Sequence, residues 1–306
     1  MDLPALRVVK AVADTGSVSR AAESLNCVQS NVTARLKRLE EELGVPLFLR
    51  LARGMEPTPP GRVLADYADR VLRLVSQARL AVADAAGCGV QLSIGTMETT
   101  AAVRLPPVLA RFHAIRPDVE MTVQPGNTQD MLAQVLAGRL DGAFVSGPVE
   151  HPELLAEPAF VEELVLVEAA AAPPAGGGGW TLLAFRPGCV YRARAEAALR
   201  AAGRVPFRVM EFGALDAILG CVAAGMGITV LPRAVVERDP WASLVAARDL
   251  PDDQARIATL FVRRRDAMET GAMRAFRKVA GMAGDAGGAT PAPTARAGLM
   301  VPDAAC

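Results

Sequence analysis

The chain has 306 residues, 51% of them hydrophobic, and its 33 basic and 33 acidic side chains balance to a net charge of zero. This length suffices for about two or three compact units, and the balance excludes a whole-chain charge argument for nucleic-acid binding. Only two histidines occur, which disfavours a histidine-based catalytic triad or metal site. We therefore expect no cofactor and no metal.

The five cysteines are widely spaced and form no Cys-x-x-Cys pair, which argues against a zinc site and favours a reduced, cytoplasmic setting. The N-terminus lacks the basic and apolar regions of a signal peptide, and no apolar run approaches the roughly 18 residues of a membrane span. The sequence thus predicts a cytoplasmic protein with no membrane partner.

Residues 1–60 have the pattern of a small helical domain. Apolar residues recur at helical spacing up to Gly16, which ends the first helix, and Ser17 caps a second helix at 18–25. After a tight turn, a third helix is predicted over about 29–43, with one apolar stripe along it. This spacing is typical of a helix-turn-helix.

Polar side chains at the start of the third helix lie off its apolar stripe. They are amide, hydroxyl and guanidinium groups, which read base edges in a DNA major groove. Arginines nearby supply the charge that phosphate contacts need, although an ordinary solvated helix face is the alternative. The candidate DNA-binding residues are Ser17, Gln29, Ser30, Asn31, Thr33, Arg35, Arg38, Arg50 and Arg53.

A short apolar segment at 44–50 leads into a turn-rich stretch at 53–61 that predicts a hairpin wing. Thr58 then caps a long helix with Pro59 at its first position. Its apolar stripe is too long for a small domain and usually pairs with a copy of itself, although a core helix of the next domain is the alternative. We assign 58–89 as a linker helix that mediates dimerisation, followed by a hinge.

From residue 90 onward strands alternate with helices, which predicts open α/β sheets of parallel type. Two strands cross between the halves, so we expect two lobes, one from 91–163 and 266–282 and the other from 164–265, with a cleft between them. The tail at 283–306 is rich in Gly, Ala, Pro and Thr and should be disordered. The expected strands are 92–95, 119–124, 140–145, 164–169, 180–185, 207–212, 227–231 and 256–263, and the expected helices are 99–115, 128–137, 192–201, 214–224 and 270–282.

Several stretches resemble the LysR-type transcriptional regulators: Ser-Val-Ser-Arg-Ala-Ala at 17–22, Leu-Glu-Glu-Glu-Leu-Gly-Val-Pro-Leu-Phe at 39–48, and the Thr-Pro-x-Gly start at 58–61. The resemblance covers roughly residues 1–282. It implies an α/β fold with an all-α winged helix-turn-helix domain at the N-terminus and a two-lobed, periplasmic-binding-protein-like effector domain. It also implies a homodimer through the linker helix and a homotetramer, with double-stranded operator DNA as partner and RNA polymerase as a further candidate.

Polar residues follow the carboxyl ends of the first strands, where open sheets bind ligands. Threonine hydroxyls at helix starts favour an anion, although Thr99 and Thr128 could be simple N-caps. The segment 185–192 resembles one LysR branch that includes glutamate-operon-type regulators, and its arginines could clamp an anion, while Glu98 would pair with one of them or meet an amino group. The candidate effector-binding residues are Glu98, Thr99, Thr100, Gly126, Asn127, Thr128, Gly147, Arg186, Cys189, Tyr191 and Arg192.

Cys189 supports an alternative function. A thiol near arginines and a helix start should have a lowered pKa and could sense oxidants, whereas a small packing residue would be inert. We find no catalytic constellation, and only three lysines are present, so an enzyme is disfavoured, as is an exported solute-binding protein. The sequence therefore predicts a LysR-type regulator that responds to a small, carboxylate-bearing effector.

Overall fold

The computed structural model describes residues 1–51, 54–86, 89–171 and 180–282. The chain divides into two compact units, Met1–Val82 and Ala83–Cys306. No helix of the described ranges is long and apolar enough to cross a membrane. Arg53, part of the expected hinge and the tail at 283–306 lie outside the described residues.

The first unit is a winged helix-turn-helix. Gly16 ends the first helix in a left-handed conformation (φ 60°), and the Ser17 hydroxyl accepts from the Arg20 N–H to cap the second. Both sequence signals are therefore confirmed. Its elements are α1 (Leu3–Thr15), α2 (Val18–Ser24), α3 (Gln29–Leu43), the hairpin strands β1 (Phe48–Leu51) and β2 (Gly54–Pro57), and the start of α4 (Pro59–Ala85).

Small and branched side chains allow the three helices to approach closely. Ala21, Ala22 and Val32 are buried between α1, α2 and α3 and pack on Val9. Leu43 continues the apolar stripe of α3 by its spacing, but it is 41% exposed because the buried part of the stripe ends before the last turn. The core thus leaves apolar surface at the end of α3.

Thr58 fixes the start of α4. Its hydroxyl donates to the Pro46 carbonyl (2.8 Å) and accepts from the Gly61 N–H (3.1 Å), so the predicted cap is confirmed. A Cβ at Gly61 would lie 1.9 Å from the Leu47 carbonyl oxygen, so only glycine permits this close approach. These contacts join the hairpin to the helix that follows it.

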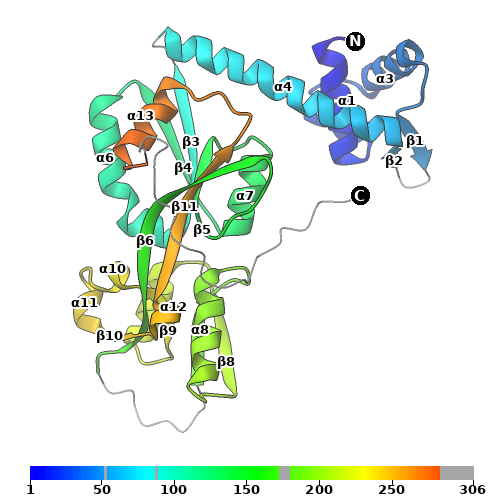
Figure 1. Ribbon diagram of the computed structural model, residues 1–306. Coiled ribbons are helices and arrows are strands. Elements are labelled where there is room, and N and C mark those ends of the chain that lie inside the picture. The colour runs from blue at the N-terminus through cyan, green and yellow to red at the C-terminus, as the bar shows by residue number, and fades with distance from the viewer. Residues whose placement is uncertain (52–53, 87–88, 172–179, 283–306) are drawn as a thin grey trace. The chain divides into compact units, whose positions relative to one another are not determined.

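The second unit has two lobes joined by two long strands, β6 (Leu154–Ala169) and β11 (Arg256–Arg264) (Figure 1). The first lobe contains β3 (Val90–Thr96), α5 (Glu98–Val103), α6 (Leu105–Ile115), β4 (Val119–Pro125), α7 (Thr128–Leu136), β5 (Gly142–Ser146) and α13 (Gly271–Val279). The second lobe contains β7 (Trp180–Phe185), α8 (Val190–Ala201), β8 (Phe207–Phe212), α9 (Leu215–Ala223), β9 (Thr229–Pro232), α10 (Arg233–Val236), α11 (Trp241–Leu244), β10 (Val245–Asp249) and α12 (Asp252–Ala255).

The main sheet is mixed, not parallel throughout as expected. Its order is β10-β6-β11-β5-β3-β4, with β9 also paired to β6. Strands β3, β4 and β5 pair in parallel, but β6 and β11 run antiparallel to each other and to their other neighbours. A crossing pair that goes out and returns must be antiparallel, so the alternation of elements predicted only the parallel part.

The second crossing lies earlier in the chain than expected. Residues 259–262 of β11 pair with 143–146 of β5, which is a first-lobe strand. These residues were assigned to the second lobe, with the boundary at 265. The error arose because the sequence shows an apolar strand but not the point along it where the partner strand changes.

The expected helix at 99–115 is two helices. Helix α5 ends at Val103 and α6 begins at Leu105, with Pro106 in its first turn. Proline has no N–H to donate to the carbonyl of Ala102, four residues earlier, so the helix is interrupted. That carbonyl instead accepts from Arg238 of the second lobe (2.7 Å).

The first lobe buries both faces of its sheet. Helices α6 and α13 cover one face of the sheet (Figure 1). On that face Phe112, Phe144, Phe261 and Phe276 form an aromatic cluster. Helix α7 covers the other face through Met131 and Val135. This packing fixes the starts of α5 and α7 at the carboxyl edge of the sheet.

Candidate functional site

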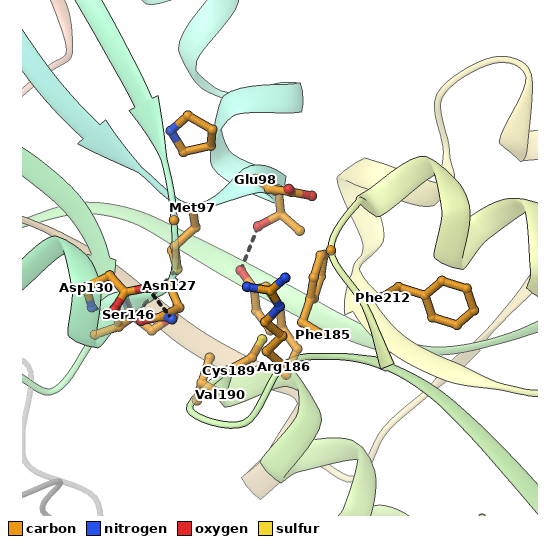
Figure 2. Close-up of a pocket in the computed structure, with 16 residues that line it drawn as sticks. Met97, Glu98, Asn127, Asp130, Ser146, Phe185, Arg186, Cys189, Val190 and Phe212 are labelled. Atoms are coloured by element: carbon orange, nitrogen blue, oxygen red, sulfur yellow. Dashed lines mark hydrogen bonds between the residues drawn. The ribbon is translucent and has the colours of Figure 1, made fainter. Parts of the chain in front are cut away.

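A cavity of about 300 Å³ lies between the two lobes of the second unit (Figure 2). It is bounded by the first turns of α5 and α7 on one lobe and of α8 on the other. Figure 2 shows Asn127, Asp130 and Ser146 on one side and Phe185, Arg186 and Cys189 on the other. Its place at strand ends is the one where α/β sheets bind ligands.

Eight of the eleven candidate effector residues line this cavity. They come from three separate segments that the fold brings together: Glu98, Thr99, Gly126, Asn127, Thr128, Arg186, Cys189 and Tyr191. The other three, Thr100, Gly147 and Arg192, are not among its lining residues.

Thr100 and Gly147 pack against neighbouring residues of the protein and do not lie at the cavity wall. Thr100 is 2% exposed, and its hydroxyl has no hydrogen-bond partner among the described residues. The Gly147 N–H donates to the Ala258 carbonyl (2.9 Å), and a Cβ at this glycine would lie 3.0 Å from a methyl group of Leu260. Gly147 thus serves the packing of β5 on β11, and its role in effector binding stays a prediction.

Arg192 is held by carboxylates of its own lobe. Its Nε donates to Glu196 (3.0 Å) and its Nη1 to Glu211 (2.7 Å). These hydrogen bonds raise the pKa of Arg192, because they stabilise the charged form. The guanidinium is already neutralised, so the expected clamp on an anion is not formed by this residue.

Arg186 differs from Arg192 in this respect. Its side chain is exposed and lines the cavity (Figure 2). Its guanidinium forms no hydrogen bond or ion pair with any residue in the described part of the chain, and it is the one cation among the described lining residues. A guanidinium in this position can take a carboxylate with two parallel hydrogen bonds.

The two threonines do not cap their helices. Met97 occupies the N-cap of α5, and Asn127 caps α7 by accepting from the Asp130 N–H (2.8 Å). The Thr99 hydroxyl instead bonds the Tyr191 hydroxyl of the other lobe (3.0 Å), and both residues are buried. The N-cap interpretation of Thr99 and Thr128 was therefore wrong.

Glu98 also reaches across the cavity. One of its oxygens, Oε2, accepts from the Leu215 N–H at the start of α9 (2.8 Å). Burial, and to a smaller degree the charge of Asp216, raise the pKa of Glu98. The expected ion pair with an arginine does not occur among the described residues.

The pKa of the Cys189 thiol is shifted in the opposite direction from the one expected. Burial raises the pKa of its thiol and outweighs the nearby N–H groups and Arg192, which lower it. The expected lowering is therefore wrong, because desolvation of a thiolate costs more than one neighbouring guanidinium returns. The thiol at this position lacks the acidity of a reactive cysteine.

The first unit carries a polar groove between the helix-turn-helix and the wing. Met55 of the wing donates its N–H to the Gly16 carbonyl (2.9 Å), which holds the hairpin against the helices. Five candidate DNA-binding residues line the groove, namely Ser17, Gln29, Ser30, Thr33 and Arg50. Asn31, Arg35 and Arg38 lie outside it, and Arg35 Nε donates to Asn31 Oδ1 (3.2 Å).

An apolar surface lies along α4. Val63, Tyr67, Val71 and Leu74 are 37–60% exposed and share one side of the helix at about 100° per residue. Leu72 lies about half a turn from this stripe and is half-buried. A stripe of this kind on an exposed helix needs a partner surface.

Two family models match the chain. The model of the bacterial regulatory helix-turn-helix protein, lysR family, matches residues 3–62, and that of the LysR substrate binding domain matches 89–283. The chain belongs to the LysR family. It is a DNA-binding transcriptional regulator and not an enzyme.

Named relatives agree with this membership. The transcriptional regulator GltR of Bacillus subtilis is 40% identical over 280 residues, covering 90% of this chain and 95% of that protein. The regulator SoxR of an Arthrobacter species is 37% identical over 277 residues, again covering 90% and 95%.

Solved structures show the same fold. Full-length OxyR from Pseudomonas aeruginosa has a TM-score of 0.64 at 22% identity, covering 92% of this chain and 94% of that one. The LysR-family regulator CbnR, in a complex with its target DNA, has a TM-score of 0.58 at 22% identity, covering 92% and 99%.

Sequence reasoning missed several lining residues of the LysR-family effector domain. Ser146 ends β5, and Asp130 lies in the first turn of α7, so both follow from the rule that strand ends line the site. Met97, Phe185 and Phe212 had no such signal, because their types are ordinary core residues. Only the packed lobes show that these side chains face a cavity.

Proposed function

We propose that this LysR-family regulator responds to a small effector with a carboxylate, bound in the cavity between its lobes. The observation that carries the proposal is Arg186, whose guanidinium lines a cavity of about 300 Å³ without a described partner. The first turns of α7 and α8 face the same space, and N–H groups at helix starts favour negative charge. A carboxylate would satisfy both features.

Hydrogen bonds between the lobes could couple effector binding to the relative position of the lobes. Thr99 meets Tyr191, and Glu98 meets Leu215, at the wall of the same cavity. An effector that contacts both lobes would favour the position of the lobes in which these hydrogen bonds form. The free energy of this shift equals the difference in its binding free energy between the two lobe positions. We propose that this shift changes how the assembled regulator holds its operator.

A thermal-shift screen of the full chain against small carboxylates tests the effector proposal. We expect at least one carboxylate to raise the Tm of the wild type, because a ligand that binds only the folded state stabilises it. The same compound should give a much smaller shift with Arg186→Ala. Arg208→Ala, on β8 and outside the cavity lining, is the matched control. Equal shifts in all three proteins would contradict the proposal.

For DNA, we propose that the start of α3 enters the major groove and the wing contacts the backbone. Gln29, Ser30 and Thr33 carry donors and acceptors into the polar groove, and Arg50 adds positive charge there. Operator titrations of Gln29→Ala and Arg50→Ala test this. The first should relax sequence preference, while the second should weaken binding to all sequences alike and reduce its dependence on salt.

For assembly, we propose a homodimer through α4 and a homotetramer through the effector domains. The exposed stripe of Val63, Tyr67, Val71 and Leu74 supports the first contact, since symmetric pairing is the common way to bury such a surface. Light scattering at micromolar concentration tests it. A monomeric wild type would contradict the proposal.

A further inference from the structure

The cavity between the lobes contains charges of both signs. Its described lining includes two carboxylates, Glu98 and Asp130, and a single guanidinium, Arg186. The three charges sum to −1 when all are ionised. A ligand that brings only negative charge therefore matches Arg186 but not the remainder of the lining.

Glu98 is the carboxylate whose charge is least compensated. One oxygen accepts from the Leu215 N–H, and no positively charged side chain among the described residues forms an ion pair with Glu98. Asp216 adds a like charge nearby, and burial together with that charge raises the pKa of Glu98. Asp130, by contrast, is exposed and accepts from the Asn127 amide (2.7 Å).

We propose that the effector of this cavity carries an ammonium group as well as a carboxylate, as an amino acid does, and that Glu98 binds the ammonium. The inference rests on the carboxylate site proposed above and names the second pole of its ligand. An ammonium would pair with Glu98 at close range in a partly desolvated site, where a second carboxylate would be repelled.

The geometry allows Glu98 to hold the ligand and the second lobe together. Its Oε2 is occupied by the Leu215 N–H, which leaves Oε1 for a ligand. The N-cap residue of helix α9 is Ala214, whose methyl side chain cannot accept a hydrogen bond, so Glu98 caps the helix from the other lobe. A ligand ammonium on Oε1 would therefore keep the carboxylate charged and the cap in place.

Calorimetric titration of the full chain tests the proposal with matched pairs of compounds. The pairs are alanine and propionate, leucine and 4-methylpentanoate, and glutamate and glutarate, each differing by one amino group. We expect at least one amino acid to bind the wild type at least tenfold more tightly than its partner. In Glu98→Gln, which keeps an oxygen for the Leu215 N–H, this preference should disappear.

Glu150→Gln removes an exposed carboxylate elsewhere in the first lobe and should keep the wild-type preference. Equal or tighter binding of the compounds without the amino group by the wild type would overturn the inference and leave the carboxylate site standing. If none of the six compounds binds, both the inference and the carboxylate site fail. Because the first comparison uses only the wild type, it holds even if Glu98→Gln does not fold.

Discussion

The polar groove of the first unit and the cavity between the lobes of the second are built in different ways. The groove is lined by residues from one stretch of chain, 17–55. They lie together because helices and a hairpin that follow one another in the sequence fold against each other. The cavity is lined by segments as far apart as 97 and 213, joined by the crossing of two strands. The neighbours of a charge in a locally built surface can be read from the nearby sequence, whereas those of a charge at an assembled site come from distant segments.

The two arginines of the segment 185–192 show what this difference means. Both have the same chemistry and lie six positions apart, yet Arg192 is neutralised by two glutamates and Arg186 is not. In the groove, by contrast, Arg50 remains exposed as expected. Charges in an assembled site can be assigned only when their neighbours from other segments are known.

The largest expected effect concerns a locally built surface, the stripe on α4. Val71→Glu would bury a charge in the proposed dimer, at a cost of about 3 kcal/mol or more, so we expect dissociation to monomers and loss of operator binding. Ser76→Glu adds the same charge on the opposite side of the helix and should leave the dimer intact. Light scattering distinguishes the two, and a dimeric Val71→Glu would rule out the stripe as the interface.

Arg186 lines the cavity and Arg192 does not, so substitutions of the two arginines should have different effects on ligand binding. Arg186→Ala should weaken binding of the carboxylate that gives the largest thermal shift by roughly 10- to 100-fold, the range for a charged hydrogen bond of about 1.5–3 kcal/mol. Arg192→Ala breaks ion pairs outside the cavity and should change this affinity by about threefold at most. Calorimetry measures both, and similar losses would show that the two arginines are not as different as their contacts indicate.

Arg35 and Asn31 test the recognition helix. Each substitution to alanine should weaken specific operator binding by about 1–3 kcal/mol, the range for a base contact. Because Arg35 Nε donates to Asn31 Oδ1, the double variant should lose less than the sum of the two. Fluorescence anisotropy with operator and unrelated DNA measures this, with Lys37→Ala on the same helix as control. An Arg35→Ala variant that binds operator like the wild type would refute the assignment.

Cys189 offers a test with a small expected effect. Since burial raises the pKa of its thiol, it should react slowly with peroxide at neutral pH. We expect Cys189→Ser to bind operator like the wild type, with or without peroxide, in the same anisotropy assay. A peroxide response that disappears in Cys189→Ser would establish redox sensing in place of a metabolite effector.

The smallest expected effect is on stability. The pKa of Glu98 is raised in the folded chain, so its ionised form costs stability above that pKa, and the cost is absent below the ordinary glutamate pKa. Glu98→Gln should therefore have a slightly higher Tm than the wild type at pH 7.5, and the difference should close as the pH falls toward 4.5. Thermal unfolding at both pH values measures it, and a lower Tm of Glu98→Gln at pH 7.5 would contradict this reasoning.

Much of the fold could be predicted because local signals set it. Gly16, Ser17 and Thr58 act on their immediate neighbours, and helical spacing indicated α1, α3 and α4 before any contact was known. The mixed sheet could not be predicted in this way. The direction of β6 and β11 depends on which strands they meet, and apolar runs carry no such information.

The sequence predicted which segments line the candidate site, but it did not predict what each side chain contacts there. Strand ends and helix starts indicated Glu98, Thr128 and Arg186, which do line the cavity. The sequence could not show that Glu98 would cap a helix of the other lobe, or that burial would outweigh a nearby arginine at Cys189. The first outcome depends on a partner 117 residues away, and the second on the burial of the thiol between packed lobes.

The central claim is that a carboxylate-bearing effector occupies the cavity between the lobes, and the thiol of Cys189 on its wall allows a direct measurement. Because the raised pKa of this buried thiol slows its reaction, the full chain would be alkylated with iodoacetamide at about pH 9 over several hours. The reaction would be run with and without a saturating amount of the carboxylate that gives the largest thermal shift, and labelling of each cysteine would be followed by mass spectrometry. We predict that the ligand slows labelling of Cys189 several-fold and leaves that of Cys27, in the DNA-binding unit, unchanged. Equal rates at Cys189 with and without the bound ligand would place the effector site elsewhere.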